Sequence, residues 1–323
     1  MIYSNGLSSV ITLCLLTIII ILSLDIGAVN LKVKFLETAT AKVFNNTGGV
    51  IQNKTAESTL PADRSLIVKL LADNLENRIN KTAAILEITG ELPQVKNVSY
   101  VSSISSELYG IPKDLDIAKR KVAQDILTFD KDLQLIFFLM PNGDNYIEEP
   151  YSRQHNLTVL NFAYRDYYKG AINTGDSYLD NVIISASSGL PISVLAVPLY
   201  SPSTNNNTIN GNRSNSNTTL LGIWSGGLNL TEFSESLQSL NLTHGERIVY
   251  VDQNGQKVAD SNKQSFEANH NESFANLQAF KNALRQQKPG SIMEMINGTR
   301  MLVFYEPVQF HTTTWAVLLF KPL

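Results

Sequence analysis

An Arg followed by two tyrosines is the segment of this sequence whose side chains are best suited to hold a ligand. Arg165, Tyr167 and Tyr168 lead into two apolar runs, which a turn at 187–189 joins and which end at Pro198. Arg presents a planar fork of donors that matches a carboxylate, and Tyr adds a hydroxyl on a flat apolar body. The pattern predicts a site that binds a small acid without reacting with it.

The other polar residues form no catalytic or metal-binding motif. Glu148 and Glu149 are neighbours, and neighbours on a strand face opposite ways. The segment 252–255 resembles the start of a calcium loop but lacks the closing Glu, so a hairpin turn is the better interpretation. The histidines lack the spacing of a zinc site: His155, His244, His270 and His311. We therefore expect no enzyme activity, no cofactor and no metal.

Length and composition are those of a folded protein with room for two domains. The 323 residues are 43% hydrophobic and 17% charged, and the net charge is −3. The sequence has no basic patch or stripe, which argues against nucleic acid as a partner. The only cysteine, Cys14, lies in an apolar run near the start, so no disulfide can form in the remainder. Two hydrophobic cores must therefore hold the fold, which suits the length.

Residues 1–29 are expected to form a transmembrane anchor. Residues 1–24 carry no charged side chain, and the apolar run 7–24 is just long enough to cross a bilayer as a helix. A cleaved signal peptide is the alternative, because Gly27 and Ala28 form a small-residue cleavage site. Residues 30–64 are expected to be a polar connector. Its lysines would lie in the cytoplasm by the positive-inside rule, whereas the sequons described next indicate export.

Asn-x-Ser/Thr sequons are spread along the chain and predict an exported, glycosylated surface. They number 12, roughly twice what the Asn, Ser and Thr content predicts, with coincidence in an Asn-rich chain as the alternative. Following the sequons, we expect a single-pass protein of the cell membrane with residues 30–323 extracellular. The candidate glycosylation sites are Asn97, Asn156, Asn206, Asn212, Asn217, Asn241 and Asn271.

The elements follow one plan twice: helix, hairpin, helical excursion and antiparallel strands. Apolar residues recur every three or four positions from Pro61 to about Thr89, which predicts a long amphipathic helix. The polar stretch 201–219 predicts an exposed loop, and Trp224 and Trp315 are expected in the cores. Because strands outnumber helices and pair with sequence neighbours, the expected class is α+β with antiparallel sheets.

Local patterns also predict the bounds of the remaining elements. Hairpin turns are expected at the Asn-Gly pairs 142–143, 254–255 and 297–298. Helices are expected at 114–129, 230–240 and 273–284. Strands are expected at 133–141, 145–149, 220–228, 246–252, 256–260, 291–296, 301–308 and 315–320.

The order of these features resembles the double Cache family, the PAS-like extracellular sensor domains of prokaryotic receptors. The resemblance covers about 65–323 and rests on the membrane segment with its long helix, on the 165–198 block and on a return strand with Gly222. The segment 250–255 and a closing strand led by Trp315 complete it. The resemblance implies two PAS-like modules with antiparallel sheets, stacked along the long N-terminal helix. The membrane-distal module would span 65–230 and hold the ligand, and the membrane-proximal module would span 231–323.

One branch of that family binds amino acids, and its motif is matched only in part. In that branch an Arg, an aromatic residue and a Tyr hold the ligand carboxylate, and Arg165, Tyr167 and Tyr168 stand at those positions. Arg165 has an alternative role, as a helix cap or as a surface partner of Asp166 or Asp180. The resemblance therefore implies a carboxylate clamp at these three residues.

The second half of that motif, which pairs with the ligand ammonium, is missing. Ile183 and Ser185 stand where a Tyr and an Asp are expected, and Gly227 replaces a later Asp. An ammonium without a partner in a pocket is costly. With Ile183 and Ser185 retained as candidate ligand-binding positions, the expected ligand is a small organic acid without a positive amine.

These inferences describe a membrane-anchored extracellular protein that binds a small, anionic ligand and senses it. The alternative is a surface glycoprotein or solute-capture module with no signalling output. Receptors of the family continue into a second membrane helix and a signalling domain, whereas this sequence ends at Leu323. We therefore expect either a longer receptor or a signalling partner protein.

Overall fold

The computed structural model describes residues 56–201, 218–243, 245–264 and 272–323, and it describes side chains from Arg64 onward. Two compact units divide the chain, Met1–Ala62 and Asp63–Leu323, and the side chains discussed below belong to the second. The expected membrane segment 7–24 and most of the connector lie outside the described residues. No helix within the described ranges is both long and apolar enough to span a membrane.

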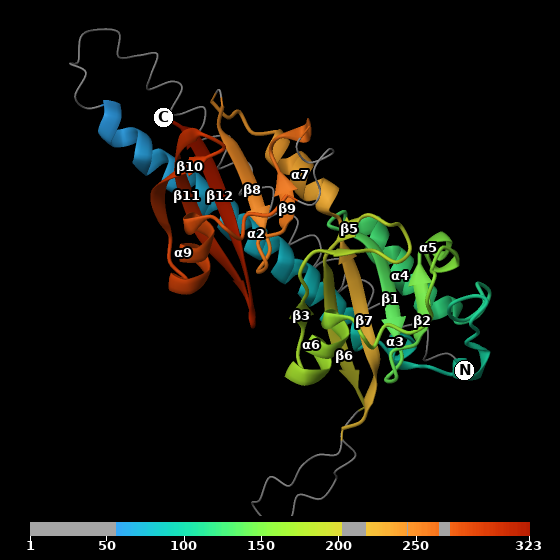
Figure 1. Cartoon of the computed structure of the whole chain (residues 1–323). Coiled ribbons are helices and arrows are strands. Elements are labelled where there is room, and N and C mark those ends of the chain that lie inside the picture. The colour runs from blue at the N-terminus through green and yellow to red at the C-terminus, as the bar shows by residue number, and fades with distance from the viewer. Residues whose placement is uncertain (1–55, 202–217, 244, 265–271) are drawn as a thin grey trace, which may run out of the picture. The chain divides into compact units, whose positions relative to one another are not determined.

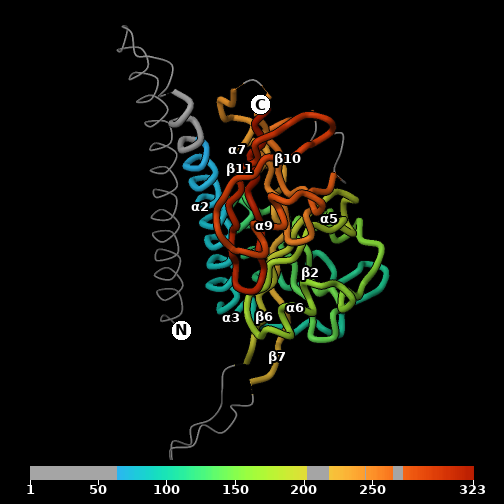
Figure 2. Tube along the Cα trace, turned by 60° about the vertical axis from the view of Figure 1, so that its left-hand side comes forward, coloured from blue at the N-terminus to red at the C-terminus, as the bar shows by residue number. Residues whose placement is uncertain are grey.

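The long helix α2, Ala56–Gly90, packs against both sheets with its residues from Ile67 onward (Figures 1 and 2). It begins at Ala56 and not at Pro61, and otherwise follows the predicted periodicity. It ends at Gly90, where an added Cβ would lie 2.6 Å from the Leu199 side chain. Arg78, Thr82 and Thr89 are buried on this helix, and its buried apolar residues are spaced by three or four positions: Val68, Ala72, Leu75, Ile79, Ala83 and Leu86.

The first sheet has five antiparallel strands in the order β2-β1-β7-β6-β3 (Figure 1). Its two faces differ in what they contact, because side chains alternate along a strand. Phe138 and Trp224 belong to the core that includes α2, whereas Phe137 and Val194 belong to a second cluster with Tyr167. The strands are β1 Leu133–Leu139, β2 Asn145–Glu149, β3 Tyr178–Leu179, β6 Val194–Tyr200 and β7 Leu220–Leu228.

Short helices surround this sheet. Helix α4, Ile117–Phe129, begins later than predicted because Asp116 caps it, its carboxylate accepting a hydrogen bond from Lys119 N at 3.3 Å. Helix α6, Asp166–Thr174, follows Arg165 directly, so the Arg takes the N-cap position without a side-chain cap bond. The others are α3 Pro93–Lys96, the 3₁₀ helix η1 Val101–Ser103 and α5 Tyr151–His155.

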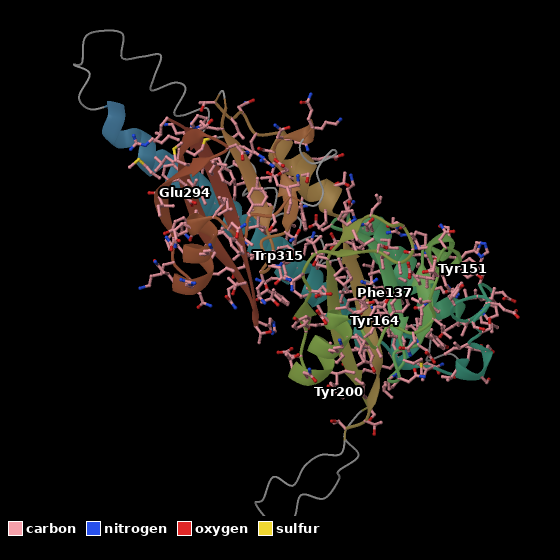
Figure 3. All side chains as sticks on the ribbon, in the orientation of Figure 1. Phe137, Tyr151, Tyr164, Tyr200, Glu294 and Trp315 are labelled. Atoms are coloured by element: carbon pink, nitrogen blue, oxygen red, sulfur yellow. The ribbon has the colours of Figure 1, made fainter. Side chains whose placement is uncertain are left out.

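The second sheet also has five antiparallel strands, in the order β10-β11-β12-β8-β9. Asn297 and Gly298 join β10 to β11 with φ of 49° and 78°, the backbone that an Asn-Gly hairpin turn requires. Trp315 is buried in its core, as expected, and is marked in Figure 3. The elements are α7 Leu230–Gln238, β8 Arg247–Val251, β9 Lys257–Asp260, α9 Gln278–Gln286, β10 Gly290–Ile296, β11 Thr299–Phe310 and β12 Thr313–Pro322.

The segment 183–192 differs from its prediction. The apolar runs on either side of the 187–189 turn form only two-residue strands, β4 Ile183–Ile184 and β5 Pro191–Ile192, in a small sheet of their own. A loop between them is closed by hydrogen bonds from Ser185 N to Leu190 O and from Gly189 N to Ser185 O. The main strand starts only after this loop, as β6, and it continues through Pro198. The turn was therefore predicted correctly, and the strand lengths were not.

Candidate functional site

A cavity opens on the face of the first sheet that carries Phe137. The empty space, including its open mouth, is about 400 Å³. Its walls come from β1, β2, the start of α6, the 183–187 segment and the start of β6. Most of the lining is apolar: Leu135, Phe137, Leu157, Phe162, Ile183, Ile184, Ala186, Ile192 and Val194.

The Arg165 side chain lines this cavity with part of its guanidinium unused. Its Nη2 donates to the Ile184 carbonyl at 3.1 Å, and the guanidinium carbon lies 5.2 Å from the centre of the Tyr164 ring. Its Nε is buried and meets no hydrogen-bond acceptor among the described residues. Figure 3 marks Tyr164 beside α6 and Phe137 on β1. The Nε atom of this charged group therefore has no protein partner, although Nη2 has one.

Neither acidic residue suggested as a surface partner of Arg165 forms an ion pair with it in the described part of the chain. Asp166 lies 3.5 Å from the Lys169 ammonium, and Asp180 accepts a hydrogen bond from Asn181 N at 2.8 Å. Burial raises the pKa of Asp180 to about 6, and the charge of Arg165 acts on it in the opposite direction without a direct ion pair. Arg165 does occupy the helix-cap position, yet its head group reaches the cavity.

The two tyrosines after Arg165 have different surroundings. Tyr167 lines the cavity and packs edge-to-face on Phe137, with ring centres 5.7 Å apart. Burial raises the pKa of its phenol, so the hydroxyl stays a neutral donor. Tyr168 is not part of the lining, and its hydroxyl donates to the Pro141 carbonyl at 2.6 Å. Adjacent helical residues point about 100° apart, which separates the two rings.

Ile183 and Ser185 both line the cavity, on the 183–187 segment that follows α6 in the sequence. The Ser185 hydroxyl lies 3.3 Å from the Ser187 hydroxyl, and Ser187 lines the cavity too. Ser185 thus brings a small polar group to the site, whereas Ile183 brings an apolar one. Of the five predicted ligand-binding residues, the structure gathers Arg165, Tyr167, Ile183 and Ser185 and leaves Tyr168 outside.

Two polar lining residues, Asn145 and Glu148, were missed by the sequence analysis. Glu148 Oε1 and Asn145 Oδ1 are buried without a donor among the described residues. Burial raises the pKa of Glu148 to about 7, against the opposing influence of the Ser187 hydroxyl and of Arg153. The neighbouring Glu149 points away and pairs with Arg120 at 2.7 Å, as strand alternation predicts.

The hairpin register explains how these two residues reach the cavity. Glu148 lies directly opposite Phe137 across the β1–β2 pair, so a cavity-facing Phe137 implies a cavity-facing Glu148. Asn145 would face the other way in a regular strand, but the register shifts between Phe138 and Leu139. This irregularity turns Asn145 to the side of Glu148. The cross-strand pairing was the available signal for Glu148, and the sequence contained none for Asn145.

The candidate glycosylation sites that the structure describes lie on the surface. Asn97, Asn156 and Asn241 are exposed, whereas Asn206, Asn212, Asn217 and Asn271 lie outside the described residues. A further sequon at Asn229 is engaged in the fold, because its side chain caps α7 and donates to the Lys131 carbonyl.

Comparisons with known proteins give one family and one fold. A family model described as Cache domain matches residues 50–323. No curated protein matches the chain. The extracellular domain of rpHK1S-Z16, a protein assigned as a histidine kinase, aligns at 14% identity with a TM-score of 0.62, over 84% of this chain and 97% of that domain.

Two chemoreceptor domains align similarly. The ligand-binding domain of CtaA from Pseudomonas fluorescens, in complex with L-isoleucine, has 14% identity and a TM-score of 0.54, over 83% of this chain and 96% of that one. The ligand-binding domain of PctC from Pseudomonas aeruginosa PAO1, in complex with GABA, has 15% identity and a TM-score of 0.52, over 80% and 98%. At such identities these likenesses establish the fold alone.

Proposed function

Because this chain, matched over residues 50–323, belongs to the double Cache family of sensor domains, we propose that it binds a small molecule outside the cell and passes occupancy to a signalling partner. The solved domains of like fold include amino-acid and GABA complexes of chemoreceptors, and these support small-molecule sensing as the class. The protein acts by binding and not by catalysis.

The ligand proposed here is a small carboxylate, and one observation carries this proposal. The Arg165 Nε is buried in the cavity wall without an acceptor. A buried unpaired donor costs about 1–3 kcal/mol, and more when it is charged. A carboxylate that enters the cavity supplies the missing acceptor and places its charge beside the guanidinium. The neutral Tyr167 and the apolar lining complete a site for a small organic acid.

The membrane arrangement is part of the same proposal. Residues 7–24 anchor the chain as a single span, 30–323 lie outside the cell, and 65–230 and 231–323 form the membrane-distal and membrane-proximal modules. The exposed sequons Asn97, Asn156 and Asn241 support the extracellular location. They equally suit the alternative function, a surface glycoprotein or solute-capture module without signalling output.

The test is a binding screen of the purified full chain against small organic acids and amino acids, read as thermal shift and then as calorimetric affinity. We expect at least one acid to bind and Arg165→Ala to weaken it by about 10- to 100-fold, the effect of losing a charge-assisted hydrogen bond. Arg285→Ala is the matched control, since Arg285 is exposed on α9.

The outcomes separate the candidates. An acid that binds Arg165→Ala as tightly as the wild type overturns the role of the guanidinium. A folded protein that binds nothing in the library favours the surface glycoprotein over the sensor. Capture without signalling leaves acid binding intact but gives no ligand-dependent response in cells that carry the chain with its signalling partner.

A further inference from the structure

We propose that Glu148 and Asn145 form a second recognition point in the cavity, which selects acids that also carry a hydrogen-bond donor. This inference rests on the proposed function of the same cavity, and it names the property that distinguishes the ligand from other small carboxylates. Sequence reasoning predicted an acid without an amine because Ile183, Ser185 and Gly227 replace the expected partners. The structure brings the Glu148 carboxylate to the cavity from β2, so the missing residues no longer argue against an amine.

Two buried acceptors of the lining are unsatisfied. Glu148 is 5% exposed and Asn145 1% exposed, yet Glu148 Oε1 and Asn145 Oδ1 have no donor among the described residues. The amide of Asn145 is oriented, because its Nδ2 donates to the Tyr109 carbonyl at 2.7 Å. This bond leaves Oδ1 as the end of the amide without a partner. Buried acceptors are nearly always paired in folded proteins, so two orphans in one lining indicate a donor that arrives with a ligand.

The two charged residues of the lining, Arg165 and Glu148, come from different elements. Arg165 enters the cavity from the start of α6 and Glu148 from β2, and no ion pair within 4.0 Å joins them in the described part of the chain. The positive group that acts on Glu148 is Arg153, not Arg165. Arg165 Nε and Glu148 Oε1 therefore do not satisfy each other. A ligand with an acid group at one end and a donor at the other satisfies both walls at once.

The chemistry of the two acceptors decides which ligand donors they favour. An ammonium suits a carboxylate and an amide oxygen best, since charge-assisted hydrogen bonds are about twice as strong as neutral ones. A hydroxyl also donates to either oxygen. A plain acid, by contrast, enters the cavity and leaves both acceptors unpaired. Selection is strong in such a case, because the penalty of the unpaired groups falls on the wrong ligand.

The experiment measures the affinities of matched acids by calorimetry with the full chain. The probes share one carbon skeleton: butyrate, 2- and 3-hydroxybutyrate, and 2- and 3-aminobutyrate. In the wild type we expect a donor-bearing acid to bind about tenfold or more tightly than butyrate. Glu148→Gln keeps the shape and removes the charge, and we expect it to cut an ammonium preference, measured as the affinity ratio of the amino acid to butyrate, to about threefold or less.

Controls keep the two proposals distinguishable. Glu107→Gln is the matched control, because Glu107 is exposed and outside the lining, and it should keep the wild-type preference. Equal affinity for butyrate and the donor-bearing acids, or an ammonium preference that survives in Glu148→Gln, overturns the second recognition point while acid binding stands. Failure of all five acids to bind counts against both proposals. A preference for the hydroxy acids over the amino acids identifies a neutral donor, and the reverse identifies an ammonium.

Discussion

Glu148 is the residue at which burial and charge conflict most directly in this protein. Its carboxylate lies in the cavity wall, and burial raises its pKa to about 7. The groups that oppose this rise are the Ser187 hydroxyl and Arg153, and the other titratable residues in the lining are Arg165 and Tyr167. Small changes of pH near neutrality therefore decide whether Glu148 is ionised. Its ionisation in the folded state lowers the free energy of unfolding.

The first residue-scale prediction follows from the sign of that shift. Because the folded-state pKa is above the ordinary 4.5, protonated Glu148 contributes stability that is fully present below about pH 4.5 and is lost as the pH rises through about 7. Glu148→Gln carries no charge at any pH. We expect it to be more stable than the wild type by about 2–3 kcal/mol at pH 8.5 and equally stable at pH 4.5.

Chemical denaturation of both proteins without ligand, from pH 4.5 to 8.5, measures this difference. Glu107→Gln should run parallel to the wild type, since Glu107 is exposed. Unfolding free energies of wild type and Glu148→Gln that stay equal at pH 8.5 would contradict the free-energy cost of burying the Glu148 carboxylate.

Helix α6 is the element on which the site depends most, since it begins directly after Arg165 and carries Tyr167. It packs closely on β3 at Gly170, where an added Cβ would lie 2.5 Å from the Tyr178 ring. The ring atoms nearest to Gly170 include the one attached to its own Cβ, so the side chain has little freedom to move away. The absence of a side chain at Gly170 is therefore what sets the distance of the helix from the sheet.

Gly170→Ala tests this packing at the scale of the element. In an exposed helix the substitution stabilises by about 1 kcal/mol. Here we expect it to destabilise the protein by about 1–3 kcal/mol, the usual cost of overpacking, and to weaken ligand binding because α6 shifts.

The matched control is the double variant Gly170→Ala/Tyr178→Ser, which removes the ring that the new methyl would meet. It should be more stable than Tyr178→Ser alone, because only the helix propensity then remains. A single Gly170→Ala that raises the unfolding free energy would show that α6 and β3 do not approach each other closely.

At the scale of the whole described fold, the cavity wall is joined to the second sheet. Asp252, at the end of β8, accepts a hydrogen bond from Val182 N at 2.7 Å, and Thr313 Oγ1 donates to the Leu179 carbonyl at 2.8 Å. Residues 179–182 lead directly into Ile183, which lines the cavity. The same Asp252 carboxylate accepts from Asn254 N and Gln256 N, so it holds the hairpin turn and the cavity segment together.

Asp252→Ala should therefore loosen two places at once. It leaves three backbone N–H groups without their acceptor, and we expect a loss of about 3 kcal/mol or more in unfolding free energy. Asp252→Asn keeps one acceptor oxygen and should lose less. Hydrogen exchange of Val182 N–H is the local measurement, and it should accelerate in Asp252→Ala far more than exchange in the centre of β11. Exchange at Val182 that matches the wild type would rule out the bond between the sheets.

Local chemistry was enough to predict much of the architecture. The long helix followed from apolar spacing, the hairpins from Asn-Gly turns, and β7 Leu220–Leu228 from an apolar run between polar segments. The buried positions of Trp224 and Trp315 were predicted from residue type. These features depend on a few neighbouring residues, because turn conformation and side-chain periodicity are properties of short segments.

What the tertiary structure alone decided is which side chains share the cavity and which of their atoms stay unpaired. Asn145 reaches it through a register shift, Glu148 through its strand partner, and Tyr168 is kept out because its hydroxyl bonds to Pro141 O. The Arg165 guanidinium meets the Ile184 carbonyl of β4 with Nη2, and its Nε stays unpaired. Such pairings bring together segments far apart along the chain, and no local pattern specifies which polar atoms will find a partner there.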